Sequence, residues 1–179
     1  AGTAASVPYT NGTADNPCPW ANALVIGGLL GITRFHVVNG ETVTLTADLK
    51  NSTVEGNNWT LALEGYNISD SQFIGAKVSG IGTSDAASTP PIFEYCGIGA
   101  VTLPGCRIYQ CGIGRATGTF TAGAGTSEQY NFIDCFSLVP GSGSPAFVFT
   151  GGTTSRGINI RRWSGGSTIT LDDVCTLSM

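Results

Sequence analysis

The chain has 179 residues and a formal net charge of -4, and only 11% of its residues are charged whereas 41% are hydrophobic. This is enough sequence for one domain with an apolar core. The acidic balance argues against a nucleic-acid surface, since Arg161-Arg162 is the only basic pair. No apolar run is long enough to span a membrane, and the 26 glycines favour turns and strands over helices.

The N-terminal part differs from the remainder of the chain. Residues 1–13 are small and polar, and we expect them to form an extended arm. Within residues 14–31, Asp15-Asn16-Pro17 is typical of a helix start, although Gly27-Gly28 weakens the helix that follows. We expect this short helix to cap the open end of the β structure that begins at residue 32.

Residues 32–179 consist of short strand-like runs separated by turns. The first runs alternate polar and apolar residues and are bounded by turn signals such as Asn39-Gly40. The sequence predicts the first four strands at residues 33–38, 42–46, 53–55 and 59–63.

One short phrase then returns five times: an apolar anchor, two variable residues, and a small residue, a cysteine or a tryptophan. The copies are Phe73–Ala76, Phe93–Cys96, Ile108–Cys111, Phe132–Cys135 and Ile160–Trp163. Their anchors recur every 15 to 28 residues, and a second strand-like run follows nearly every copy. This recurrence is typical of a β-solenoid, whose coils must stack to bury their apolar sides. A Greek-key sandwich is the alternative, but it gives no reason for one phrase to repeat in register.

The six cysteines fall into two groups. The first group occupies the same place in successive copies of the phrase and comprises Cys96, Cys111 and Cys135. Because a solenoid stacks like residues on one another, we expect buried free thiols there, with disulfides as the alternative. The second group lies outside that column and comprises Cys18, Cys106 and Cys175. These three are the candidates for cross-links within or between subunits.

The sequence points to no catalytic or metal site. Glycoside hydrolysis needs two carboxyl groups about 5–10 Å apart, but Glu94 and Asp134 occupy neighbouring offsets after their anchors and are expected on opposite sides of their strands. The adjacent acids Asp172-Asp173 lack a third cation ligand, and the one histidine, His36, has no partner nearby in sequence. No nucleophile elbow or phosphate loop is present, and the glycines of Gly97–Gly99 and Gly112–Gly114 are expected in turns between coils. We therefore expect no catalytic, cofactor-binding or metal-ligating residue and a protein that is not an enzyme.

Two tryptophans lead to different interpretations. An exposed Trp59 on a flank of the solenoid would stack on a sugar ring, which makes it a weak glycan-contact candidate. Trp163 falls in the cysteine column and is expected to fill the core.

Several phrases are similar to a β-helix module of virion proteins from tailed bacteriophages. The resemblance spans residues 11–179 and rests on Asn11–Pro17, Gly31–Gly40, Trp59–Gly65, Val78–Gly82, Val101–Pro104, Gly118–Gly123, Asp134–Ser137 and Asn159–Gly166. It implies a right-handed parallel β-helix on the outside of a phage particle, as a head-decoration or tail component. It also implies a homo-oligomer, often a trimer, that contacts capsid or tail proteins.

Two functions are compatible with this resemblance. The first is a non-enzymatic structural protein that decorates or reinforces the virion, assembled in the host cytoplasm and carried on the extracellular particle. Its second group of cysteines would link neighbouring copies once the particle leaves the reducing cell. The alternative is a tailspike- or fibre-like module that binds or cleaves host surface polysaccharide. Residues 174–179 are strand-like and carry no cap, so we expect another subunit or further chain to cover that end.

Overall fold

The computed structural model describes Thr13 and residues 16–85, 88–114, 119–123, 129–138, 145–150 and 155–179. The expected N-terminal arm lies outside the described residues except for Thr13. In chain order the elements are α1 (Trp20–Leu30), β1 (Arg34–Val37), β2 (Thr42–Thr44), β3 (Thr53–Ala62), β4 (Gln72–Ile81), β5 (Ile92–Glu94), β6 (Gly97–Leu103), β7 (Cys106–Tyr109), β8 (Gly112–Ile113), β9 (Thr119–Ala122), β10 (Gln129–Ile133), β11 (Phe136–Ser137), β12 (Ala146–Phe149), β13 (Arg156–Arg161), β14 (Thr168–Leu171) and β15 (Cys175–Ser178).

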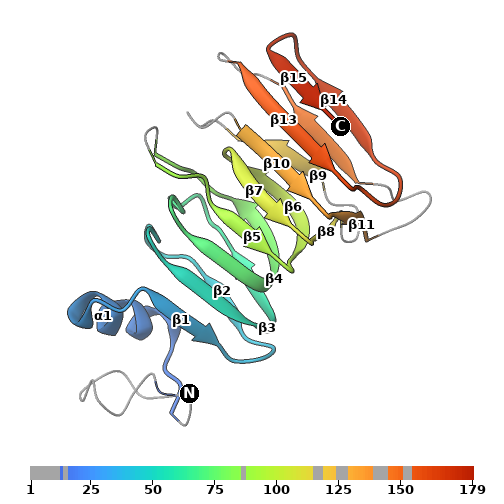
Figure 1. Cartoon of the computed structure of the whole chain (residues 1–179). Helices are drawn as coiled ribbons and strands as arrows, with labels where there is room; N and C mark the ends of the chain where they lie inside the picture. Colours follow the sequence, from blue (N-terminus) through green and yellow to red (C-terminus); the bar gives the residue numbers. More distant parts are fainter. Residues whose placement is uncertain are drawn as a thin grey trace.

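The strands pair in parallel and stack into a solenoid of about seven turns (Figure 1). One ladder runs β1-β3-β4-β5-β7-β10-β13-β15, and the other runs β2-β3-β4-β6-β9-β12-β14. Strands β3 and β4 are long enough to belong to both ladders, while β8 and β11 extend from β6. The predicted parallel β-solenoid with a short N-terminal helix is confirmed.

The five copies of the repeated phrase stack in register. Phe73 pairs with Phe93, Phe93 with Ile108, Ile108 with Phe132, and Phe132 with Ile160. All five anchors are buried. The segments between the strands differ in length, which explains how anchors at unequal sequence intervals occupy one column.

A left-handed residue occupies the third position of each copy. The third positions of the phrase have φ between 51° and 75° and comprise Gly75, Tyr95, Gln110, Asp134 and Arg162. This conformation is uncommon for residues other than glycine and asparagine. It turns the chain so that the fourth residue of the phrase points into the core, whereas the third residue lies on the outer surface.

The core is a single apolar column enclosed by the two ladders. Its C-terminal half is an aromatic cluster whose rings meet at centroid distances of 5.1 to 6.4 Å and which comprises Phe120, Tyr130, Phe132, Phe147 and Phe149. Trp163 adds an edge contact to Phe147 at 5.4 Å, but it is only partly buried, so it packs against the core and does not fill it as predicted.

Helix α1 begins later than the sequence predicts. Its N-cap is Pro19, with no side-chain capping bond, and Asp15 lies outside the described residues. The helix packs on the first coil, where Trp20 meets Phe35 edge-on at a centroid distance of 5.3 Å. Gly27 permits this approach, because a Cβ there would lie 2.8 Å from the Phe35 ring.

Candidate functional site

Trp59 is not a surface residue. Its side chain is fully buried, and its indole N–H donates to the carbonyl oxygen of Ile74 at 2.9 Å. Trp59 pairs with Ala76, which is the fourth position of the first phrase, so it belongs to the same inward column as the cysteines. The prediction that Trp59 contacts a glycan is therefore wrong. The insertion at Gly56–Asn58, where the strand register shifts, concealed this alignment in the sequence.

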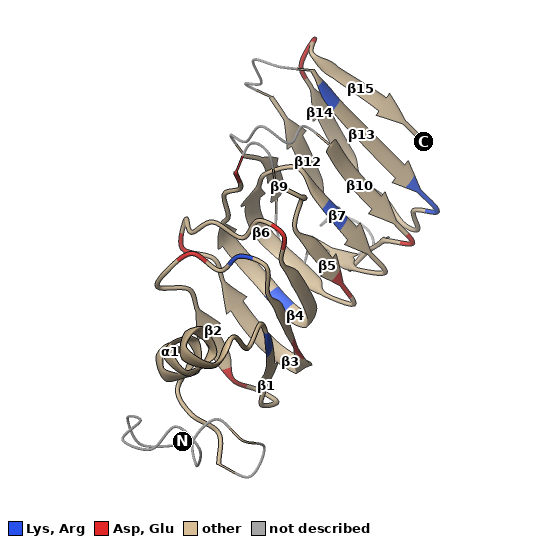
Figure 2. Cartoon of the chain, turned by 60° about the vertical axis from the view of Figure 1, so that its left-hand side comes forward, with Lys and Arg blue, Asp and Glu red and all other residues tan. Residues whose placement is uncertain are grey.

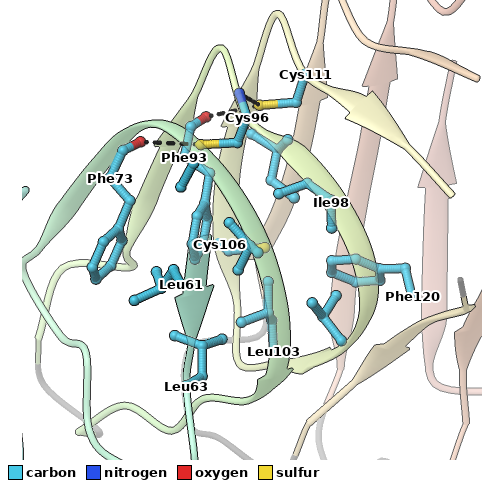
Figure 3. Packing of buried hydrophobic residues seen from close by; sticks show 14 of the residues in the cluster. Leu61, Leu63, Phe73, Phe93, Cys96, Ile98, Leu103, Cys106, Cys111 and Phe120 are labelled. Atoms are coloured by element: carbon cyan, nitrogen blue, oxygen red, sulfur yellow. Dashed lines mark hydrogen bonds between the residues drawn. The ribbon is translucent and has the colours of Figure 1, made fainter. Parts of the chain in front are cut away.

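The three stacked cysteines form a ladder of free thiols at one corner of the solenoid (Figure 3). Each thiol lies near the carbonyl oxygen of the preceding coil's anchor: Cys96 with Phe73 and Cys111 with Phe93, both at 3.5 Å. The Cys96 amide also donates to the Cys111 sulfur at 3.2 Å. The prediction of buried thiols in this column is confirmed, and the thiols supply hydrogen bonds to carbonyl groups at the corner.

The cysteines of the second group differ in how deeply they are buried. Cys106 is fully buried at the start of β7, so it is a core residue and the prediction that it cross-links subunits is wrong. Its side chain faces inward because it lies two residues before the anchor Ile108 on the same strand. Cys18 and Cys175 are partly exposed, and all six cysteines of the chain lie in its described part as free thiols.

Three of the four buried thiols, those of Cys106, Cys111 and Cys135, are poor nucleophiles, whereas the hydrogen bond with Cys111 lowers the pKa of Cys96. Burial raises the pKa of Cys135 to about 11 and also raises the pKa of Cys106. The hydrogen bond with Cys96, followed by burial, raises the pKa of Cys111. Because the thiolate is the reactive form, these residues are structural rather than catalytic.

The acids of the repeated phrases do not face one another. Glu94 lies at the end of β5, whereas Asp134 lies at a left-handed corner and forms an ion pair with Arg162. Arg162 donates from Nε and Nη2 to the two carboxylate oxygens, and this bonding holds the pKa of Asp134 below its usual value. The pair joins two adjacent coils and is a structural contact.

Several other charged groups make local contacts. Lys50 pairs with Asp85 at 2.7 Å, and the Asn67 amide donates to the same carboxylate at 2.7 Å. His36 is exposed on β1, and Asp172 accepts a hydrogen bond from the Cys175 thiol at 3.1 Å. Within the described ranges, no three His, Cys, Asp or Glu residues are grouped so that they could hold a metal ion. Figure 2 shows the charged residues scattered over turns and strands along the solenoid.

The two ends of the solenoid carry exposed apolar surface. At the N-terminal end, the outer side of α1 exposes Val25, Leu29 and Leu30, and Leu29 is 74% exposed. At the opposite end, β14 and β15 each pair on one side only among the described strands (Figure 1). Leu171 and Met179 are exposed there. We name these surfaces the α1 face and the terminal coil.

An open groove of about 670 Å³ lies along the corner of the middle coils. Four outward positions pair in register across its floor: Lys77 with Gly97, Gly97 with Gly112, and Gly112 with Phe136. Gly97 leaves space beside Lys77, whereas Gly112 is buried beneath the Leu138 side chain. Tyr95, Gln110 and Asn58 line one side, and Leu138 lines the other.

Two glycines of this groove belong to a short motif that occurs twice in the sequence. Gly97 and Gly112 each follow a column cysteine, in two copies of Cys-Gly-Ile-Gly. They were expected in turns between coils, but Gly97 begins strand β6 and Gly112 begins strand β8. The lack of a side chain at Gly97 leaves open space, whereas at Gly112 it makes room for the Leu138 side chain.

Comparison with known proteins found no matching family model, no matching curated protein and no matching solved structure. No helix in the described part of the chain is long and apolar enough to cross a membrane.

Proposed function

We propose that the protein is a non-enzymatic structural component of a bacteriophage particle, which decorates or reinforces the head or tail by packing against neighbouring subunits. The phage context rests on the sequence resemblance alone. The packing role rests on the apolar side chains that α1 exposes, and the terminal coil adds to it where no further chain covers that end.

The α1 face is the stronger of these two surfaces. The helix WANALVIGGLL contains no charged residue, and its buried residues are Ile26 and Gly27. A helix that is apolar on all sides is normally enclosed by protein. Here one side covers the first coil, through Trp20 and Leu24, while Val25 and Leu29 face outward. This outward face fits an apolar surface on a neighbouring subunit.

The terminal coil offers a second contact surface where no further chain covers it. Strands β14 and β15 present a backbone edge and the side chains of Ile169, Leu171 and Leu177, which are partly or largely exposed. An open strand edge beside apolar side chains is a template for pairing with another chain. Neighbouring subunits that cover both ends would convert a single solenoid into part of a longer assembly.

The low charge of the chain fits this role because few charged groups need to be dehydrated when surfaces meet. Of the three cysteines proposed as cross-links, Cys18 and Cys175 remain candidates because they lie near the two ends and are partly exposed. A Cys18–Cys175 link between copies would join opposite ends of neighbouring solenoids.

Substitution of the α1 face tests the proposal. We expect the wild-type protein to self-associate, or to bind the other virion proteins, in a concentration-dependent way. The Leu29→Ser variant should weaken this association, because Leu29 is the most exposed leucine of the helix. Ile81→Ser is the matched control, since Ile81 is 54% exposed on β4 and belongs to neither end. Multi-angle light scattering measures the mass of each species; equal masses for all three proteins at every concentration would contradict the role of α1.

A further inference from the structure

We propose that Cys96 and Cys111 form a site of thiol–disulfide exchange, in which Cys96 attacks a low-molecular-weight disulfide and Cys111 then displaces the bound group to leave a Cys96–Cys111 disulfide. The site lies within one chain, at the corner of the middle coils, so it is independent of the subunit contacts proposed above. Three observations carry the inference: the spacing of the two residues, the position of the Cys111 sulfur, and the opening of the groove at Cys96.

The backbone holds the two cysteines at a separation that suits a disulfide. Strands β5 and β7 pair directly before the cysteines, and Gly97 pairs with Gly112 directly after them. The Gly112 amide also donates to the carbonyl oxygen of Cys96 at 3.0 Å. Neighbouring strands lie about 4.8 Å apart, and the two Cα atoms of a disulfide are separated by about 4.4–6.8 Å. The bond therefore fits the existing spacing of the coils.

The sulfur of Cys111 already lies beside Cys96. It is 3.2 Å from the backbone nitrogen of Cys96, which donates to it, whereas the Cys96 sulfur points back towards the carbonyl oxygen of Phe73 at 3.5 Å (Figure 3). Rotation about the Cα–Cβ bond of Cys96 to another staggered position would carry its sulfur away from Phe73 and towards Cys111. This movement releases only the contacts of the Cys96 thiol with two carbonyl oxygens, which are weak because a thiol is a weak donor.

Cys96 is the thiol of the pair that meets the surface. All six cysteines lie in the described part of the chain, and Cys96 is the one that lines the open groove of about 670 Å³. The small residues Gly75, Ala76 and Gly97 line the groove around it. A Cβ at Gly97 would meet only the Leu138 side chain, at 3.9 Å. A small disulfide can therefore approach Cys96 from the groove.

The acidities of the pair differ in the direction that exchange requires. The hydrogen bond with Cys111 lowers the pKa of Cys96, whereas the same bond, together with burial, raises the pKa of Cys111. The thiolate is the nucleophile, so Cys96 is the attacking residue and Cys111 the resolving one. Burial raises the pKa of Cys135 to about 11, which disfavours attack by this third thiol of the column.

The exchange takes two displacement steps. The Cys96 thiolate bonds to one sulfur of the external disulfide, breaks its S–S bond and releases one thiolate. Cys111 then loses its proton to solvent as its sulfur bonds to the Cys96 sulfur, which breaks the mixed disulfide and releases a second thiolate. Two protein thiols are thereby oxidised, and the external disulfide is reduced to two thiols, which take up the two protons that the cysteines lose.

Peptide mapping after exposure of the folded, full-length chain to glutathione disulfide tests the site. The reaction is stopped with acid, the free thiols are alkylated in denaturant, and the chain is digested with trypsin without reduction. Cleavage after lysine and arginine places Cys96 and Cys106 in peptide 78–107 and Cys111 in peptide 108–115. Fragmentation of the first peptide between its two cysteines distinguishes them. We expect a Cys96–Cys111 link, while the fully buried Cys106 remains a free thiol.

Substitution of each cysteine in the column separates the attacking role from the resolving role. Cys111→Ala removes the resolving thiol, so Cys96 should accumulate as its mixed disulfide with glutathione; a Cys96 that stays free in this variant would contradict its role. Cys96→Ala should leave Cys111 unmodified. Cys135→Ala is the matched control and should leave the Cys96–Cys111 link intact. Circular dichroism verifies that each variant is folded.

Three results for the wild-type protein would overturn the inference. The first is that Cys96 and Cys111 both remain free thiols. The second is that Cys96 and Cys106 react at equal rates, because access would then come from unfolding and not from the groove. The third is a Cys111–Cys135 link in place of the Cys96–Cys111 link. A bond within one chain leaves the mass measured by light scattering unchanged, so these results are distinct from those that test assembly.

Discussion

Phe73 and Phe93 stack face to face on adjacent coils, with their ring centroids 5.3 Å apart and their planes inclined by 19°. Both rings are fully buried. We predict that Phe93→Ala lowers the free energy of unfolding by about 3–5 kcal/mol, because it removes the ring and leaves a cavity. Ile92→Ala, at the neighbouring outward position, should have a much smaller effect. Urea denaturation measures both variants, and equal losses would contradict the inward column.

Two glycines with positive φ provide a paired test of backbone crowding. Gly75 has φ of 75°, and a Cβ there would lie 2.1 Å from the Gly56 carbonyl oxygen on the preceding coil. Gly65 has φ of 85°, but nothing lies within 4 Å of its Cβ position. We expect Gly65→Ala to lower the free energy of unfolding by about 1 kcal/mol. Gly75→Ala should lower it by about 3 kcal/mol or more, since steric overlap adds to the conformational strain. Similar values for both variants, measured by denaturation, would contradict the close approach of the coils.

The ion pair of Asp134 and Arg162 predicts a loss of stability in acid. Hydrogen bonding from Arg162 lowers the pKa of Asp134 in the folded state, so the unfolded chain binds the proton more readily. Its contribution to stability is therefore present above the unfolded pKa of about 4 and disappears as the pH falls through the lower folded pKa. Melting temperatures measured from pH 7 to pH 2.5 should fall less steeply for Asp134→Asn than for the wild type. Parallel curves of melting temperature against pH for the two proteins would show that the ion pair adds nothing to stability.

The thiol ladder predicts the opposite dependence in alkali. The pKa of Cys135 is raised by burial to about 11, whereas an unfolded thiol has a pKa of about 8.5. The neutral thiol makes its full contribution to folding stability below a pH of about 8.5, and this contribution is lost as the pH rises towards 11. We expect the melting temperature of the wild type to fall over this range. The fall should be shallower in Cys135→Ala, and an identical slope in both proteins would exclude Cys135 as its source.

The inward column was visible in the sequence because burial restricts residue type. Phe73, Phe93, Ile108, Phe132 and Ile160 recur as anchors because each occupies the same space between two neighbouring coils. Position in the phrase therefore predicted the stacking partner, although the intervals between anchors are unequal. The same reasoning correctly placed the thiols of the column inside the core.

Residues outside the repeated phrase were harder to place. Cys106 precedes the anchor Ile108 by two positions, so strand alternation also turns it inward, but a preceding proline and glycine suggested a turn. Trp59 lies after an insertion that shifts the strand register, which no periodicity reveals. The groove depends on what surrounds Gly97 and Gly112 in three dimensions, and this information is absent from either copy of the motif alone.

The mass of the purified protein in solution, measured by light scattering before and after addition of a reductant, tests the structural role most directly. The account predicts an oligomer whose mass rises with concentration, since the exposed apolar side chains of the α1 face favour contact with a neighbouring subunit. A decrease in mass with reductant would identify Cys18 and Cys175 as links between copies. A monomer at every concentration that also fails to bind capsid or tail proteins would contradict the proposed function.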